Sequence, residues 1–280
     1  MKYRMKLWTG ISAAALIAAS SAVAGKADPA PHDGPGGALQ LAAMGEGEGE
    51  GGEGEGGEGG EGGVDPAQAA KDPAVYLSAL DIIRAHYLAG EAMLNVEGGR
   101  RAAGEMFAHP ISEVYIDLEP VFEARGVTLF MDEMTNAVER ALGDAPKDEV
   151  ETAVAQVYVA LDKAEKKAPD GDKDAVAVEA ALAADMFDRA ARQYDAALAP
   201  AGSDEAWIDG YGFWKMAERR AATLLPRLEG DHEALAEEIA AAKLLFGSAY
   251  ESVEKPEKPD VEVGVLLASS SRILLKTSRF

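Results

Sequence analysis

The sequence predicts an all-α protein, an up-and-down helical bundle of about eight helices. Alanine, leucine, glutamate, lysine and arginine, which favour helices, dominate from Asp72 to the end of the chain. Apolar residues recur there at helical spacing, and no alternation typical of strands persists. Glycine and proline stand at intervals that suit helix ends. With short connections, such helices could pack as two subbundles.

The first helix is predicted to begin at Asp72 and to end at the glycine pair 98–99. Asp72 suits the N-cap, and Pro73 suits the first helical position because its missing N–H is not needed there. Residues that should face the core follow at a spacing of about 3.6. They are Tyr76, Leu80, Ile83, Tyr87, Gly90 and Leu94.

The later helices follow from the same signals. A short helix over 100–108 meets His109-Pro110, where proline predicts a kink or a new helix start. Because only a turn-rich segment joins them, the helices at 148–167 and 174–198 are predicted to form a long antiparallel pair. The other helices are predicted at 110–125, 128–142, 203–226, 231–246 and 261–276. The helix that follows Ser203 contains the predicted aromatic anchor of the core, which consists of Trp207, Tyr211, Phe213 and Trp214.

The N-terminal region predicts export. Residues 1–24 contain basic residues, a short apolar stretch and an Ala-Val-Ala cleavage site before Gly25, which together indicate a signal peptide. Residues 25–71 are predicted to be a disordered leader, in which 45–63 consists only of glycine and glutamate and should act as an acidic spacer. The helical domain would then span 72–280. We therefore expect a periplasmic or secreted protein with no stable membrane insertion.

Composition narrows the function further. The formal net charge of −22 disfavours nucleic acid and anionic lipid as partners. The chain has no cysteine, so it offers neither a disulfide nor a thiolate ligand. Ser269 to Ser271 lack the glycine pattern of a hydrolase nucleophile, and no glycine-rich turn suggests nucleotide binding. The sequence therefore predicts a protein that is not an enzyme.

Histidine and carboxylate residues gather in the first two helices. His86 and Glu91 lie on the first, and His109, Glu113 and Asp117 on the second, where a spacing of four residues would put His109 and Glu113 on one face. If the helices pack antiparallel, these side chains could form a site for iron or copper, since imidazole and carboxylate suit such ions. The alternative is structural: His109 would cap the helix start, His86 would fill the core, and the acids would interact with the helix dipole.

Methionine offers a second type of ligand, because thioethers bind Cu(I). The candidates are Met93, Met106, Met131, Met134 and Met216, and the alternative for each is flexible filling of the core.

Two segments, AWIDGYGFWKMAERR and LAEEIAAAKLLFGSAYES, occur together with the histidine and carboxylate residues in a helical chain that carries an export signal. In this the region from Asp72 to Tyr250 resembles periplasmic imelysin-like proteins, some of which serve iron uptake. The family's motif is G-x-H-x-x-E. The nearest segment here is FAHPISE, in which Ala108 precedes the histidine. Glu113 stands one residue further from the histidine than the glutamate of the motif does. The resemblance implies a role in metal binding for His109.

Together these observations predict an exported helical protein that binds or delivers a transition metal, iron or copper, through His109 and Glu113 with His86, Glu91 and Asp117. The alternative is a helical interaction module that docks another envelope protein without a metal.

Overall fold

Side-chain caps and prolines set where several helices begin. The Asp72 carboxylate accepts a hydrogen bond of 2.8 Å from the N–H of Ala74, and Pro73 is the first residue of its helix. Asp174 and Ser203 cap two later helices in the same way, through the N–H groups of residues 176 and 206. Each of these ends uses a polar oxygen to satisfy a backbone donor that has no partner within the helix.

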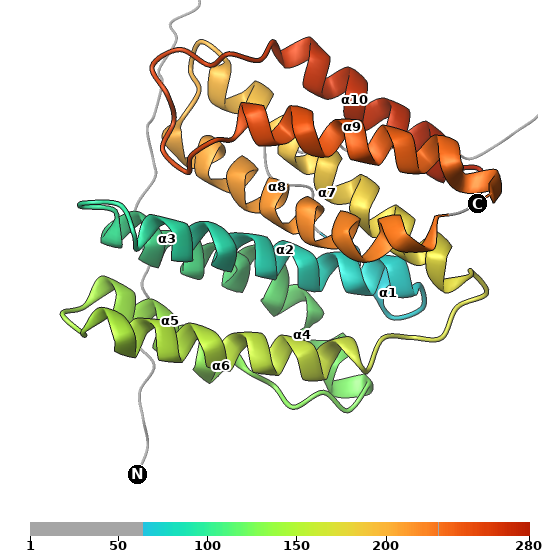
Figure 1. Cartoon of the computed structure of the whole chain (residues 1–280). Helices are drawn as coiled ribbons and strands as arrows, with labels where there is room; N and C mark the ends of the chain where they lie inside the picture. The colour runs from blue at the N-terminus through green and yellow to red at the C-terminus, as the bar shows by residue number, and fades with distance from the viewer. Residues whose placement is uncertain (1–63, 229) are drawn as a thin grey trace, which may run out of the picture. The chain divides into compact units, whose positions relative to one another are not determined.

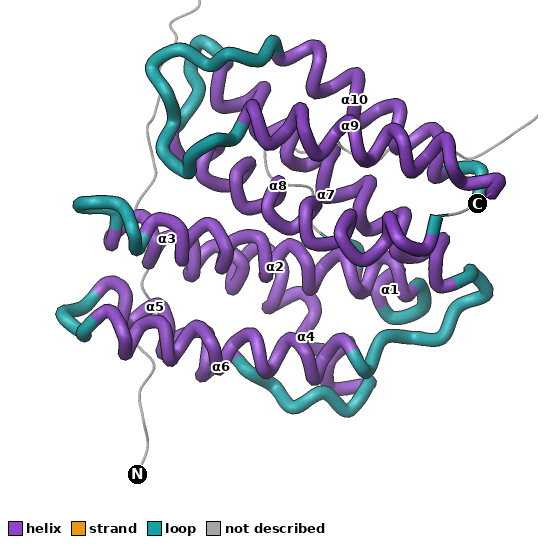
Figure 2. Tube along the Cα trace, viewed as in Figure 1, coloured by secondary structure: helices purple, strands orange, loops and turns teal. Residues whose placement is uncertain are grey.

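The computed structural model describes residues 64–228 and 230–280, which fall in one unit, Gly56–Phe280. Helices and loops make up this part of the chain, without strands, so the predicted all-α bundle is confirmed (Figure 2). The helices are α1 (Pro66–Ala69), α2 (Pro73–Met93), α3 (Arg100–Pro110), α4 (Ile116–Ala124), α5 (Met131–Leu142), α6 (Lys147–Glu165), α7 (Ala175–Leu198), α8 (Asp204–Leu224), α9 (Glu233–Ala249) and α10 (Val263–Thr277). A π-helical turn, Ile111–Tyr115, joins α3 to α4, and the short 3₁₀ segments Leu225–Arg227 and Gly230–His232 lie between α8 and α9.

The predicted signal peptide at 1–24 and the glycine-glutamate segment at 45–63 lie outside the described residues. The described chain starts within the predicted leader, at Val64, and includes the short helix α1. Ala69 of α1 is fully buried, and α1 packs against α2. Among the described helices, none combines the length and the apolar character needed to cross a membrane.

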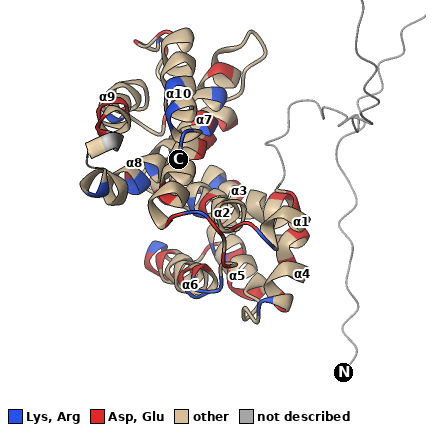
Figure 3. Ribbon diagram, turned by 90° about the vertical axis from the view of Figure 1, so that its right-hand side faces the viewer, with Lys and Arg blue, Asp and Glu red and all other residues tan. Residues whose placement is uncertain are grey.

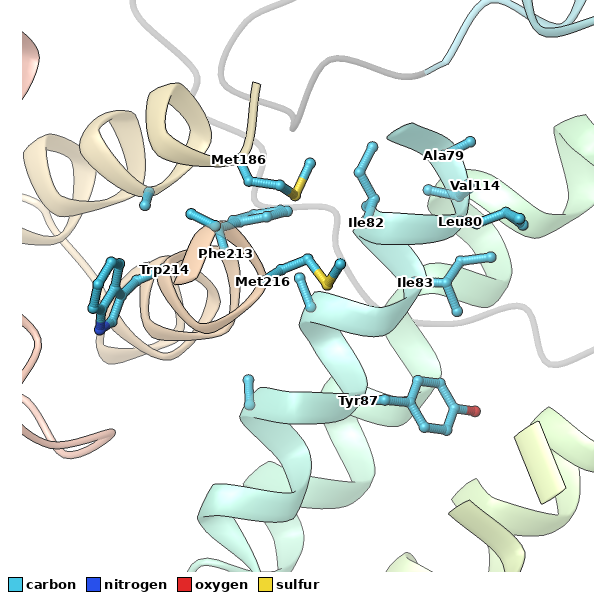
Figure 4. Close-up of a cluster of buried hydrophobic side chains, with 14 of the residues drawn as sticks. Ala79, Leu80, Ile82, Ile83, Tyr87, Val114, Met186, Phe213, Trp214 and Met216 are labelled. Carbon is cyan, nitrogen blue, oxygen red and sulfur yellow. The ribbon is translucent and has the colours of Figure 1, made fainter. Parts of the chain in front are cut away.

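Helix α2 lies at the centre of the bundle. It packs against α3 and α6 on one side and against α7 and α8 on the other, and α9 and α10 lie beyond α7 and α8 (Figure 1). Ile82 projects toward the side of Phe213 and Met216, whereas Ile83 and Tyr87 project the opposite way (Figure 4). Apolar residues on both faces explain why α2 is buried from two directions.

The predicted antiparallel pairing of the helices at 148–167 and 174–198 is wrong. Helix α6 packs against α5 and α2, whereas α7 packs against α8, α10 and α2, and α6 does not pack along α7. The loop at 166–174 runs from one group of helices to the other (Figure 2). A connection of this length does not require neighbours in sequence to be neighbours in space.

Aromatic side chains fill the core, as predicted. Trp207, Phe213 and Trp214 are buried, while Tyr211 is only partly buried. Trp207 contacts Tyr250 at 5.0 Å between ring centroids. The candidate methionines 93, 106, 134 and 216 are buried in the same core, where they fill space between helices.

Charged residues are also buried at the contact between α2 and α8. Arg220 donates two hydrogen bonds to Asp81, of 2.7 and 2.8 Å, and Arg84 approaches the same carboxylate at 3.3 Å. Asp81 is fully buried, and the two arginines are less than a tenth exposed. On the outer surfaces of the helices, by contrast, acidic and basic residues are interspersed (Figure 3). The buried group joins α2 to α8 by ion pairs.

The buried hydroxyl of Tyr76 makes the bundle lose stability at alkaline pH. Its hydroxyl donates a hydrogen bond of 3.0 Å to the carbonyl of Ala164, and burial raises the pKa of Tyr76 to about 12. The unfolded chain loses this proton near pH 10, so the stabilisation is complete below pH 10 and is lost as the pH rises to about 12. We expect the difference in free energy of unfolding between the wild-type protein and Tyr76→Phe, measured with guanidinium, to shrink by on the order of 2 kcal/mol across that window. If both proteins lose the same free energy of unfolding over this pH range, the assignment is contradicted.

Candidate metal centre

His86 lies on α2 with one ring nitrogen fixed by the helix itself. Its Nδ1 is 2.8 Å from the carbonyl oxygen of Ile82, one turn earlier, and its side chain is 1% exposed. A carbonyl oxygen only accepts hydrogen bonds, so Nδ1 must carry the proton. In the neutral ring, Nε2 then presents its lone pair to the groups across from it. Histidine ligands in metal sites are commonly oriented in this way.

Two carboxylates face that nitrogen from two other segments. Glu113 Oε2, from the π-helical turn, is 3.4 Å from His86 Nε2, and Asp209 Oδ1, from α8, is 3.6 Å away. Two ligands of a tetrahedral ion lie about 3.4 Å apart when each bond is about 2.1 Å long. The spacing of these atoms therefore matches that of ligands around one ion.

His109 brings a second imidazole to the same place. Its ring lies 6.1 Å from the ring of His86, centroid to centroid, and the ligand atoms of His86, His109 and Asp209 all lie within 4.8 Å of one another. His109 Nε2 is also 3.5 Å from Glu205 Oε1 in the first turn of α8. Two imidazoles and a carboxylate form a ligand set used by iron, zinc and copper.

The π-helical turn places Glu113. The sequence leads to an expectation of either a kink or a new helix at Pro110, but the helix continues through this residue and widens over Ile111–Tyr115. Proline cannot donate the usual backbone bond, and a wider turn with i to i+5 bonding accommodates that loss. Such turns often occur at functional sites.

An aromatic ring covers the buried end of this group. The ring of Phe213 packs edge-on against His86, with centroids 5.7 Å apart. Side-chain exposure rises from 1% at His86 and 8% at Asp209 to 23% at His109, 39% at Glu113 and 62% at Glu205. The group thus has a buried inner end and an exposed outer end.

No protein-family model, curated protein or solved structure matches this chain. The resemblance to imelysin-like proteins therefore stays a prediction, and the case for a metal centre depends on the geometry.

The structure brings three of the five candidate residues together and leaves two outside. His86, His109 and Glu113 lie in the group described above. Glu91 instead accepts a hydrogen bond of 2.6 Å from the hydroxyl of Tyr158 on α6. Five residues of helix rotate a side chain by about 140°, so Glu91 and His86 face different neighbours. Asp117 is exposed on α4.

Sequence reasoning missed Asp209 and Glu205, which approach from a helix more than ninety positions further along the chain. One signal was present. Asp209 lies between Trp207-Ile208 and Gly210 in an aromatic segment whose residues are predicted to be buried, and a carboxylate is costly to bury without a partner. Glu205 lies four residues before it, on the same face of the helix.

Proposed function

We propose that this chain, once exported, binds a transition metal ion, with iron or copper as the first candidates, and makes it available for delivery. The observation that supports this most directly is the contact set of His86: Nδ1 is held by a carbonyl, and Nε2 faces carboxylates at 3.4 and 3.6 Å. His109 adds a second nitrogen.

The ligand types favour a transition metal over calcium or magnesium. The hard ions prefer sites composed of oxygen, whereas imidazole favours iron, copper and zinc. The exposed outer end, at Glu113 and Glu205, suits an ion that exchanges with the surroundings. Such exchange is what binding for delivery requires.

Elemental analysis and calorimetry test this function. We expect the mature protein isolated from the periplasm to carry about one metal ion, and the purified apoprotein to bind Zn²⁺, Cu²⁺ or Fe²⁺. Saturation at 100 times the dissociation constant should add about 2.7 kcal/mol to the free energy of unfolding, which raises Tm by several degrees.

Substitutions locate the ion. His86→Ala and Asp209→Asn each remove one proposed ligand. Changes to residues that only support the ligands typically weaken metal affinity by roughly 10- to 100-fold, so we expect each substitution to raise Kd by at least that much. Asp209→Asn keeps the side-chain volume, so it covers the case in which His86→Ala fails to fold. His232→Ala is the matched control, since His232 stacks on Phe280 at 4.2 Å, away from this group. Equal affinity in all three variants would show that the ion binds elsewhere, and no binding to the wild-type protein would reject the proposed function.

A further inference from the structure

Two pairs of side chains with the same chemistry lie one behind the other in this region. The inner pair is His86 and Asp209, with 3.6 Å between Nε2 and Oδ1. The outer pair is His109 and Glu205, with 3.5 Å between Nε2 and Oε1. Each pair combines an imidazole and a carboxylate at the spacing of two ligands of one ion.

The two pairs form a graded path from solvent to core. Glu205 and Asp209 are four residues apart on α8 and so share one face of the helix. Along this face the exposed fraction of the side chain falls from 62% to 8%. From His109 to His86 it falls from 23% to 1%. An imidazole and a carboxylate are therefore available near the surface, and a second imidazole and carboxylate are available in the interior.

We propose that His109 and Glu205 form an outer metal site, which captures a hydrated divalent transition metal ion and passes it to the inner pair. This inference rests on the proposed function. His109 contributes to both positions, because one of its ring nitrogens also lies within 4.8 Å of the ligand atoms of His86 and Asp209. The ion exchanges Glu205 for Asp209 while it remains bound to His109.

Stepwise exchange lowers the barrier to entry. A small divalent ion holds its water tightly, and each protein ligand that replaces a water offsets part of the cost of dehydration. The exposed carboxylate of Glu205 also attracts cations from solution. Glu205 thus acts on the rates of binding and release more than on the final affinity.

Stopped-flow binding of Zn²⁺ to the apoprotein, with the metal alone and a competing chromophoric chelator, tests the outer site. We expect Glu205→Gln to slow both association and dissociation by about tenfold, with Kd changed less than threefold. Asp204→Asn is the matched control, because Asp204 is adjacent, exposed and in the same first turn of α8. It removes the same charge and should change either rate by less than about twofold.

The outcomes separate this inference from the function on which it rests. If Zn²⁺ binds but Glu205→Gln behaves like Asp204→Asn, the outer site is rejected and the inner site stands. If Glu205→Gln speeds dissociation and leaves association unchanged, Glu205 is a permanent ligand of the bound ion, and transfer between pairs is rejected. If neither the wild-type protein nor the variants bind Zn²⁺, Cu²⁺ or Fe²⁺, the proposed function itself fails.

Discussion

Replacing Asp81 by asparagine is expected to lower the free energy of unfolding by about 3 kcal/mol, the lower end of the range for breaking a buried ion pair. The carboxylate is fully buried and accepts two hydrogen bonds from Arg220 and a weaker one from Arg84. Without it, two guanidinium groups stay buried near a neutral amide. Arg84 keeps Glu165 at 2.6 Å, and Arg220 keeps Glu179 at 3.3 Å, which limits the loss.

Asp162→Asn provides a matched control for Asp81→Asn in guanidinium unfolding. Asp162 contacts the same Arg84, at 3.1 Å, but its side chain is 67% exposed. Exposed ion pairs contribute at most about 1 kcal/mol because water screens them. If both substitutions cost the same, the buried group between α2 and α8 does not stabilise the fold in the way inferred here.

Replacing Gly212 by alanine is expected to reduce both the stability of the fold and the affinity of the proposed metal site. A Cβ atom at this position would lie 2.3 Å from the backbone oxygen of Ala85, so α8 would have to move away from α2. Forced overpacking of this kind costs about 1 to 3 kcal/mol. The shift would also separate Asp209 from His86, which face each other across the same helix contact. We expect Kd for Zn²⁺ to rise about tenfold or more.

Gly247→Ala is the control for Gly212→Ala. Gly247 lies within α9, and its nearest atom to an added Cβ is Cζ2 of Trp214 at 3.6 Å, an ordinary contact. Because glycine is unfavourable inside a helix, this substitution should stabilise the fold by about 0.5 to 1 kcal/mol and leave Kd unchanged. A Gly212→Ala variant with wild-type affinity would show that close approach of α8 to α2 does not position the proposed metal ligands.

Closeness in sequence was enough to predict some of the site residues, whereas others depended on helix rotation and register. His86, His109 and Glu113 could be proposed because they lie close in sequence, on two successive helices whose packing was a reasonable expectation. Glu91 was proposed on the same grounds, but the helical rotation between it and His86 turns it to Tyr158. The spacing of His109 and Glu113 assumed a regular helix, and the π-helical turn after Pro110 changes that register.

The sequence by itself determined most of the helical segments and where many of them begin. Caps such as Asp72 and Ser203, and the apolar periodicity of each segment, act within a few residues along the chain, so they can be read without knowing the neighbours. The all-α class follows from these local signals alone.

Only the tertiary structure decided which helices are neighbours. Helices α6 and α7 follow each other in sequence yet pack in different places, whereas α2 and α8 meet although more than a hundred residues separate them. Such contacts depend on the close approach at Gly212 and on the buried pairing of Asp81 with Arg220. Their energies arise between segments, and no local pattern specifies them. The meeting of His86 with Asp209, and of His109 with Glu205, belongs to the same class of contact.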